Sequence, residues 1–254
     1  MTTENRVRMF DVDFDALRLD EASQRLLGWA SERKSRVVVT PNVDHIVQIE
    51  SRPELLPVYN TADLVLADGQ PLIWAARLLG TPLPERVAGS DLFPLLLQQA
   101  QHRGGLRLFL LGGKTGIPER AADNIRRDYP WINVVGTHSP PLGFETRALE
   151  NEQAVTAVAS ADADIVLLAL GAPKQELWAH RERSRLSCGA ILCLGATVDF
   201  MAGTIPRAPR WMSRVGLEWV FRVAGEPQRL AKRYARDALV FPQLLTRELL
   251  NRRA

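Results

Sequence analysis

The chain has 254 residues, of which 46% are hydrophobic, and this length and composition predict one large globular domain with a sizeable buried core. Its two cysteines, Cys188 and Cys193, suit a reducing cytosol better than a disulfide scaffold. The polar start, Met1 to Arg8, does not resemble a secretory leader, and no apolar run approaches the roughly 20 residues that span a bilayer. We therefore expect a cytoplasmic protein that is at most peripheral to the membrane.

Strand and helix patterns alternate along most of the chain. An N-cap at Asp20 predicts a helix to about Arg33, and the β-branched run from Arg36 to Thr40 predicts the first strand. Further strand-like runs follow at Leu64 to Leu66, Leu106 to Leu111, Ile132 to Val135, Ile165 to Leu170 and Ala190 to Leu194. This alternation predicts an α/β fold, with a Rossmann-like, mostly parallel sheet and helices on both of its faces.

The sequence changes character after Thr204, where strand patterns stop and basic helical patterns begin. This change predicts a Rossmann-like core over residues 1–202 and a basic helical C-terminal appendage over residues 203–254. The appendage has eleven Arg or Lys residues against four acidic ones, a net charge of +7, while the whole chain carries +3. Such a segment predicts an anionic partner, which is a phosphorylated substrate, an anionic membrane surface or nucleic acid; a solvated charged face is the alternative.

One carboxylate stands where a predicted strand ends and a helix begins. Asp68 follows the apolar run Leu64 to Leu66 and precedes a helix that opens at Pro71. In open α/β sheets ligands bind at the carboxyl ends of the strands, so an acid at this point is well placed to act as a general base. The alternative is that Asp68 only caps the helix or shapes the Asp-Gly turn.

Polar side chains follow other predicted strands as well. Thr40 and Asn42 follow the first strand, where Asn42 would also serve as a helix cap. The run Gly171-Ala172-Pro173-Lys174-Gln175-Glu176 lets the backbone approach a ligand and opens a helix whose N-terminus favours an anion. Asp199, after the last strand, is suited to accept hydrogen bonds from ribose hydroxyls. Together with Asp68 these clusters predict one shared polar crevice.

Several familiar ligand motifs are incomplete in this sequence. Gly113-Lys114-Thr115 ends like a P-loop, but the first glycine of that motif would fall at Leu108. The run from Gly112 to Gly116 lacks the glycine spacing of a dinucleotide fingerprint. Asp11-Val12-Asp13 and Asp162-Ala163-Asp164 have the Asp-x-Asp pattern of metal-dependent transferases, but neither follows a strand of the predicted sheet. The four histidines are scattered along the chain, and we expect neither a metal nor another cofactor.

A series of sequence blocks occurs in an order that is typical of one bacterial family. The blocks are Thr40-Pro41-Asn42, Ala67-Asp68-Gly69, Arg86-Val87-Ala88-Gly89-Ser90-Asp91, Leu111-Gly112-Gly113, Gly171-Ala172-Pro173-Lys174-Gln175-Glu176, Gly195-Ala196-Thr197-Val198-Asp199-Phe200, Arg207-Ala208-Pro209-Arg210-Trp211, Gly216-Leu217-Glu218-Trp219 and Glu226-Pro227-Gln228-Arg229. From about Phe10 to Tyr234 the chain resembles the WecG/TagA/CpsF glycosyltransferases, which are glycosyltransferase family 26 and include N-acetylmannosaminyltransferases.

The resemblance implies a reaction and a set of site residues. Members of the family move a hexose, an N-acetylhexosamine or its uronic acid from a UDP-sugar to a polyprenyl-pyrophosphate-linked saccharide, with inversion and without a metal, in the synthesis of cell-surface polysaccharide or teichoic acid. By matched position, Asp68 is implied as the catalytic base. The implied substrate-binding residues are Thr40, Asn42, Arg86, Gly171, Lys174, Gln175 and Asp199.

The appendage has a functional interpretation and a structural one. Two helical patterns meet around Gly225, the first containing Trp211 to Val223 and the second beginning near Gln228. The resemblance implies that this segment lies at the membrane surface and folds over the site, where Arg222, Arg229 and Lys232 would meet the acceptor pyrophosphate. The alternative is a solvated helix that its apolar residues pack against the core.

Two other classes of protein compete with the transferase. A non-catalytic peripheral module would bind anionic lipid or nucleic acid through the basic C-terminus, and an α/β oxidoreductase would need the dinucleotide fingerprint that is absent. We favour the transferase, with a UDP-sugar, a polyprenyl-pyrophosphate-linked saccharide and the anionic inner face of the cell membrane as partners, and without nucleic acid. A homo-oligomer is compatible with the sequence, which does not specify the sugar.

Overall fold

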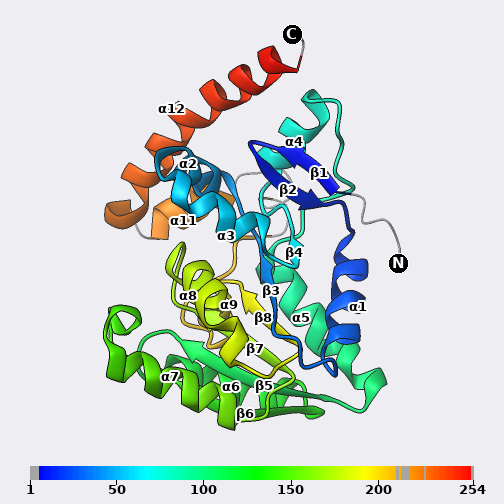
Figure 1. Ribbon diagram of the computed structural model, residues 1–254, viewed down its shortest axis with the longest axis vertical. Helices are drawn as coiled ribbons and strands as arrows, with labels where there is room; N and C mark the ends of the chain where they lie inside the picture. Colours follow the sequence, from blue (N-terminus) through cyan, green and yellow to red (C-terminus); the bar gives the residue numbers. More distant parts are fainter. Residues whose placement is uncertain (1–5, 210–211, 213–217, 226, 253–254) are drawn as a thin grey trace.

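A six-stranded parallel sheet forms the centre of the protein, as the alternation predicts (Figure 1). The computed structural model describes residues 6–209, 212, 218–225 and 227–252. The strand order in the sheet is β4-β3-β8-β7-β5-β6, and every neighbouring pair is parallel. The strands are β3 (Arg36–Val39), β4 (Leu64–Val65), β5 (Leu106–Gly112), β6 (Ile132–His138), β7 (Ile165–Ala169) and β8 (Ala190–Cys193).

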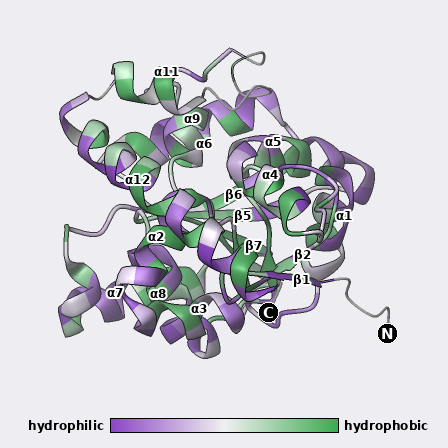
Figure 2. Cartoon of the chain, turned by 90° about the horizontal axis from the view of Figure 1, so that it is seen from above, coloured by the Kyte–Doolittle hydropathy of each residue, from purple (hydrophilic) through white to green (hydrophobic). Residues whose placement is uncertain are grey.

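Helices cover both faces of the sheet because successive side chains of each strand point to opposite sides. On β3, Val37 and Val39 enter one buried cluster while Val38 enters the other. The first cluster packs against α2 (Val43–Ser51), α3 (Leu56–Asn60), α4 (Gln70–Leu78), α7 (Ala148–Ser160) and α8 (Lys174–Glu182). The second packs against α1 (Leu19–Trp29), α5 (Gly89–Gln99), α6 (Ile117–Asp128) and α9 (Thr197–Met201). Figure 2 shows the strands as the hydrophobic centre of these layers.

A short antiparallel hairpin, β1 (Arg6–Met9) and β2 (Val12–Asp15), precedes the sheet and is not indicated by the strand patterns above. Its turn residues Phe10 and Asp11 both have positive φ angles, of 52° and 61°, without the glycine that usually marks such a turn. The buried carboxylate of Asp15 attaches the hairpin to the sheet by accepting the Val65 N–H at 2.8 Å.

The C-terminal segment is helical and packs against the body. It contains α11 (Glu218–Gly225) and α12 (Pro227–Asn251), and α12 lies against α2 (Figure 1). Phe241 and Leu244 of α12 are buried in the first core cluster. The helical prediction is therefore confirmed where the chain is described, although most of Trp211 to Leu217 lies outside the described residues. The independence of the two predicted domains stays a prediction.

The first helix differs from its prediction at both ends. Arg18 is the N-cap residue, and its N–H donates to Glu21 Oε2 at 2.7 Å, so Asp20 lies within the first turn. The helix ends at Trp29, and the chain then reverses through Arg33 and Ser35, which both have positive φ angles. Side-chain hydrogen bonding at the start and backbone reversal at the end decide these boundaries.

Candidate active site

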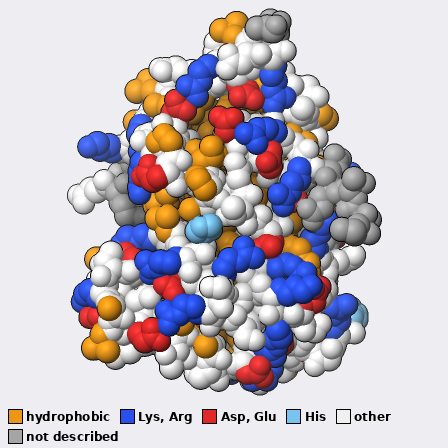
Figure 3. All heavy atoms as spheres, viewed as in Figure 1, with side chains coloured by type: hydrophobic (Ala, Val, Ile, Leu, Met, Phe, Trp, Pro, Cys, Tyr) orange, Lys and Arg blue, Asp and Glu red, His pale blue; other side chains and the backbone are white. Residues whose placement is uncertain are grey.

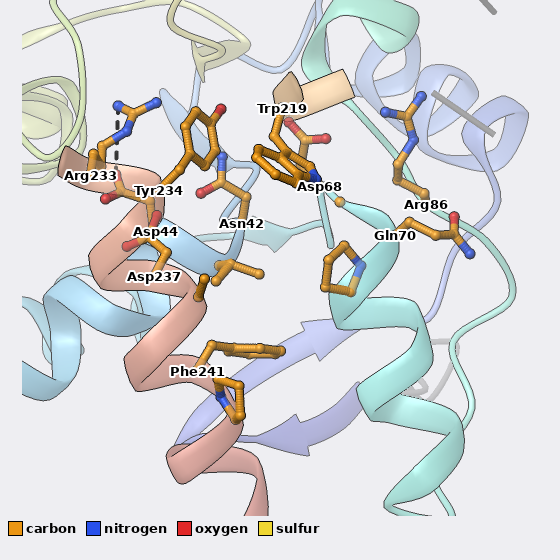
Figure 4. A pocket seen from close by; sticks show the side chains of 15 residues that line it. Asn42, Asp44, Asp68, Gln70, Arg86, Trp219, Arg233, Tyr234, Asp237 and Phe241 are labelled. Carbon is orange, nitrogen blue, oxygen red and sulfur yellow. Dashed lines mark ion pairs between the residues drawn. The ribbon is translucent and has the colours of Figure 1, made fainter. Parts of the chain in front are cut away.

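A cavity of about 310 Å³ opens at the carboxyl ends of β3 and β4, between the turns that follow these strands and α12 (Figure 4). Its lining comes from the start of α2, the β4–α4 turn, Arg86, α11 and α12. The lining residues are Asn42, Val43, Asp44, Asp68, Gly69, Gln70, Pro71, Arg86, Trp219, Arg233, Tyr234, Asp237, Ala238, Phe241 and Pro242. The cavity thus brings together Asn42 and Asp68, which were expected in a shared crevice, and Arg86, which the family resemblance implies as a substrate-binding residue.

Asp68 is half-buried in the wall of this cavity. Its backbone N–H donates to the carbonyl oxygen of Pro41 at 3.0 Å, which ties the turn after β4 to the turn after β3. Gly69 follows with a φ of 130° and serves as the N-cap residue of α4. A side chain at Gly69 would be strained in that conformation, and its Cβ would lie 3.9 Å from Asn42 Cβ. The helix cap is therefore Gly69 and not Asp68.

Asn42 caps α2 and contacts His45. Its Oδ1 accepts the His45 N–H at 3.4 Å, and its own N–H donates to His45 Nδ1 at 3.2 Å. The Nδ1 atom also lies 2.8 Å from Asn42 Oδ1, where the donor depends on the tautomer of the ring. Asn42 therefore has the capping role that the sequence offered as an alternative, and it lines the cavity as well.

Arg86 is held by an acid at the start of α5. Its guanidinium donates to Asp91 Oδ2 at 2.6 Å, and Arg207 donates to Asp91 Oδ1 at 2.6 Å. Arg207 also donates to the Ser90 carbonyl oxygen at 2.7 Å. One carboxylate at the start of α5 is thereby shared by two guanidinium groups.

The appendage supplies the opposite wall. Trp219 of α11 and Tyr234 of α12 lie with their ring centroids 6.0 Å apart, and both face Asp68 and Asn42 at one end of the cavity (Figure 4). Phe241 lies at the other end. Aromatic rings of this kind present flat apolar faces that suit the carbon face of a sugar or a lipid chain.

Acidic and basic groups meet where α12 contacts α2. Asp44 of α2, which is buried, accepts from Arg236 Nη2 at 2.9 Å and lies 3.8 Å from Arg233 Nη1. The neighbouring Asp237 is 4% exposed, and its Oδ2 has no hydrogen-bond partner among the described residues. Burial and, after it, the Asp44 carboxylate raise the pKa of Asp237 to about 6, while Arg236 and Arg233 act in the opposite direction.

Gln175 and Glu176 lie behind the cavity at the start of α8. Both are buried, and Gln175 Nε2 donates to Glu176 Oε1 at 2.8 Å. The same oxygen of Glu176 is 3.8 Å from His45 Nε2. Neither residue is among those that line the cavity, so the structure places Gln175 next to the site rather than in its wall.

The remaining predicted residues lie near strand ends but outside the cavity wall. Thr40 is buried at the end of β3, and Asp199 is half-buried in α9, where Thr204 Oγ1 is 3.5 Å from its Oδ1. Gly171 is exposed, with a φ of 77°. Lys174 is exposed and pairs with Glu145 at 3.2 Å. Their roles in substrate binding stay predictions.

The three cations predicted for the acceptor pyrophosphate lie on the appendage helices. The side chains of Arg222 and Arg229 are outside the described part of the structure. Lys232 is exposed on α12, whereas the next residue, Arg233, lines the cavity. The sequence analysis missed the contribution of Arg233, Tyr234 and Asp237, whose only signal was their position in a basic helix that follows the core.

Both Asp-x-Asp motifs lie away from the cavity. Asp11 and Asp13 pair with Arg8, and Asp162 pairs with Arg33 and Arg107 at the amino end of β7. Within the described ranges, no cluster of three or more His, Cys, Asp or Glu side chains has a metal-binding arrangement. No helix there combines the length and the hydropathy that crossing a bilayer requires.

The parallel sheet and its strand-end carboxylate define an α/β protein with a candidate site at the carboxyl ends of the strands, where open α/β sheets bind their ligands. Residues 7–254 match the glycosyl transferase WecG/TagA/CpsF family, and the chain belongs to this family. It is 29% identical over 226 residues to an N-acetylglucosaminyldiphosphoundecaprenol N-acetyl-beta-D-mannosaminyltransferase of Bacillus spizizenii, covering 89% of this chain and 83% of that protein. A protein of the same name from Bacillus subtilis is 29% identical over 201 residues, covering 79% of this chain and 76% of that protein.

Proposed function

We propose that this chain is an inverting, metal-independent glycosyltransferase that moves a hexose or N-acetylhexosamine unit from a UDP-sugar to a polyprenyl-pyrophosphate-linked saccharide. The observation that carries the proposal is the cavity in which Asp68, Asn42 and Arg86 meet, in a member of a glycosyl transferase family. The names of the two relatives favour N-acetylmannosamine as the transferred sugar and N-acetylglucosaminyl-diphosphoundecaprenol as the acceptor.

The chemistry needs one base. Asp68 takes the proton of the acceptor hydroxyl while the hydroxyl oxygen forms a bond to the anomeric carbon, on the face opposite the nucleotide. The bond between the anomeric carbon and the UDP oxygen breaks at the same time, and its electron pair leaves with UDP. A single displacement of this kind inverts the anomeric configuration. It needs no second carboxylate, which agrees with a cavity wall in which the two other acids, Asp44 and Asp237, both accept from Arg236.

Charge on the departing diphosphate requires positive groups or oriented N–H donors. Arg86 and Arg233 line the cavity, and Arg233 lies 3.8 Å from the Asp44 carboxylate. We propose that Arg86 serves the departing diphosphate, because it lies on the core side of the cavity with Asn42 and Asp68. Arg222, Arg229 and Lys232 of the appendage are proposed to serve the pyrophosphate of the acceptor instead. The Asp-x-Asp pairs engage arginines away from the cavity, which supports a reaction that needs no bound metal.

The side of the cavity formed by the appendage is proposed to lie at a membrane. Trp219, Tyr234 and Phe241 make this side apolar along the length of the cavity, and a lipid-linked saccharide carries an apolar chain beside its sugars. The appendage adds net positive charge, which favours the anionic inner face of a cell membrane. We therefore propose a peripheral enzyme that meets its acceptor at the inner face of the membrane.

A panel of UDP-sugars tests the proposal. The full chain is incubated with UDP-N-acetylmannosamine, its uronic acid or UDP-glucose, together with a synthetic prenyl-pyrophosphoryl N-acetylglucosamine, and released UDP is measured. We expect UDP release with at least one donor, and the fastest release with UDP-N-acetylmannosamine. Binding to anionic vesicles without release from any donor would instead favour the non-catalytic peripheral module.

A further inference from the structure

A buried polar cluster, made of Asn42, His45, Gln175 and Glu176, joins two strand ends behind the cavity. Exposed fractions are 9% for His45, 3% for Gln175 and 1% for Glu176. Asn42 and His45 come from the start of α2, after β3, whereas Gln175 and Glu176 come from the start of α8, after β7. Because β8 separates β3 from β7 in the sheet, the cluster connects turns that are not adjacent.

The contacts form a continuous chain. Asn42 contacts His45 Nδ1, with distances of 3.2 Å from its N–H and 2.8 Å from its Oδ1. The opposite nitrogen of the ring, Nε2, faces Glu176 Oε1 at 3.8 Å. That oxygen accepts the carboxamide of Gln175 at 2.8 Å. His45 therefore stands between the capping residue of one turn and the buried carboxylate of the other.

Stability alone does not explain the cluster. Glu176 Oε2 and Gln175 Oε1 are buried and have no hydrogen-bond partner among the described residues. Leaving acceptors unpartnered in the interior is unfavourable, and apolar side chains of similar size would usually be as stable or more so. Buried polar groups that are costly in this way are often kept because they fix one arrangement of the chain.

We infer that His45 and Glu176 are positioning residues that hold Asn42 and Gln175 at one spacing, so that two strand ends bind the sugar nucleotide together. The inference rests on the proposed function, because it takes the sugar nucleotide as the ligand of the two turns that carry Asn42 and Gln175. His45 and Glu176 themselves do not line the cavity and act through the residues they contact. Loss of either one loosens the donor site without removing a group that contacts substrate.

Two substitutions separate positioning from capping and from folding. His45→Gln keeps a residue type that accepts the Asn42 N–H at the third position of the helix, but it cannot bridge to Glu176 at the same time. Glu176→Gln keeps the shape and one acceptor for Gln175 while it removes the charge that faces His45. We expect each change to raise KM for the donor about tenfold and to change kcat less than about threefold.

Glu182 provides a matched control on the same helix. Glu182 is 4% exposed and contacts Asn151, Arg181 and Arg185. It is the last residue of α8, whereas Glu176 lies in the first turn. Glu182→Gln should lower the midpoint of urea unfolding and leave the donor KM within about twofold, because a buried carboxylate far from the site acts only on stability. If Glu176→Gln acted only by destabilising the fold, Glu176→Gln and Glu182→Gln would change the unfolding midpoint and the donor KM alike.

A double-mutant cycle makes the test quantitative. Combined with Asn42→Ala, Glu176→Gln should cost much less in kcat/KM than it does alone, whereas Glu182→Gln should combine additively. Unchanged donor KM in both His45→Gln and Glu176→Gln, or additive behaviour with Asn42→Ala, would overturn the inference. A wild-type chain that releases UDP from no donor would overturn the proposed function instead, so the two failures are distinguishable.

Discussion

At the residue scale, the position of Asp68 depends on the backbone around it. The Asp68 N–H is bound to Pro41, and Gly69 adopts a φ of 130° that other residues avoid. The carboxylate is thereby presented at the cavity next to Asn42 rather than used as a helix cap. Because α4 begins after Gly69 and the backbone holds the turn, an amide of the same shape at position 68 should be accommodated without unfolding the chain.

Asp68→Asn should therefore remove the catalytic base while the chain keeps its fold. We expect turnover to fall by about 10² to 10⁴, because an amide cannot take the proton of the acceptor hydroxyl, with UDP binding and the unfolding midpoint nearly unchanged. The measurement is UDP release under saturating donor and acceptor, alongside urea unfolding. Turnover close to that of the wild type would show that Asp68 only shapes the turn.

At the element scale, α12 is attached to the body by both apolar and charged contacts. Phe241 and Leu244 enter the core, Arg236 pairs with Asp44, and Arg247 donates to Glu50 at 2.8 and 2.7 Å. On the face shown in Figure 3, basic and acidic side chains are interspersed. Part of the positive charge of the appendage thus binds the body. Deleting residues 203–254 would also uncover core residues, so point substitutions test the appendage more cleanly.

The contact between α12 and α2 should depend on pH through Asp237. Its pKa of about 6 in the folded chain lies above the ordinary value of 3.8, so the folded state binds the proton more tightly. The contribution of Asp237 to the free energy of unfolding is therefore most favourable below about pH 4, and it is lost as the pH rises to about 6. Above that pH the charged Asp237 carboxylate is buried near Asp44, and the full penalty is subtracted from the free energy of unfolding.

Asp237→Asn should remove this penalty. We expect the variant to exceed the wild type in free energy of unfolding by about 1 kcal/mol at pH 7.5, and the difference to shrink or vanish at pH 4.5. Urea unfolding at the two pH values gives the comparison. A difference that is the same at both pH values would mean that Asp237 does not titrate in this range.

The sequence predicted the sheet well because buried parallel strands are continuous apolar runs. Predicted β3, β4, β5, β7 and β8 are within one residue of the observed ends, whereas β6 extends to His138 because its polar last residues still pair with β5. The polar residues at the strand ends could be predicted too, because they directly follow these apolar runs. The aromatic wall of the cavity could not be predicted from the sequence, since Trp219 and Tyr234 reach Asp68 only through the packing of α12 on α2.

At the scale of the whole molecule, the cavity is formed by the core on one side and the appendage on the other. The core contributes Asn42, Asp68 and Arg86, and the appendage contributes Trp219 and Tyr234. Neither part alone contains the whole wall. Activity should therefore depend on how the appendage sits against the body, and on the charges that it offers to a lipid-linked acceptor.

Arg222 and Arg229 should matter more for transfer than for membrane attachment. Each basic residue near an anionic surface contributes about 1 kcal/mol, so the remaining cations would keep much of the vesicle binding. Replacing both by Ala should lower transfer to a lipid-linked acceptor at least about tenfold, because hydrogen bonds to a charged pyrophosphate are lost. Vesicle sedimentation and transfer assays are compared, with Arg247→Ala as control because Arg247 pairs with Glu50. An equal loss in both assays would assign the two residues to the membrane alone.

Transfer should also continue in the presence of a chelator. The acids of both Asp-x-Asp motifs pair with arginines, and we expect EDTA to leave the rate within about twofold. The rate is measured before and after dialysis against the chelator. Loss of activity that Mg²⁺ or Mn²⁺ restores would contradict the proposal of metal independence.

The central claim, acceptor-dependent transfer with inversion, is tested most directly by one product analysis. The full chain is incubated with an α-linked UDP-N-acetylhexosamine and a prenyl-pyrophosphoryl N-acetylglucosamine, and UDP release and the anomeric configuration of the new linkage are measured together. The account predicts UDP release that requires the acceptor and a product with the β configuration. Release without acceptor, no release with any UDP-sugar, or a product that retains the α configuration would contradict it.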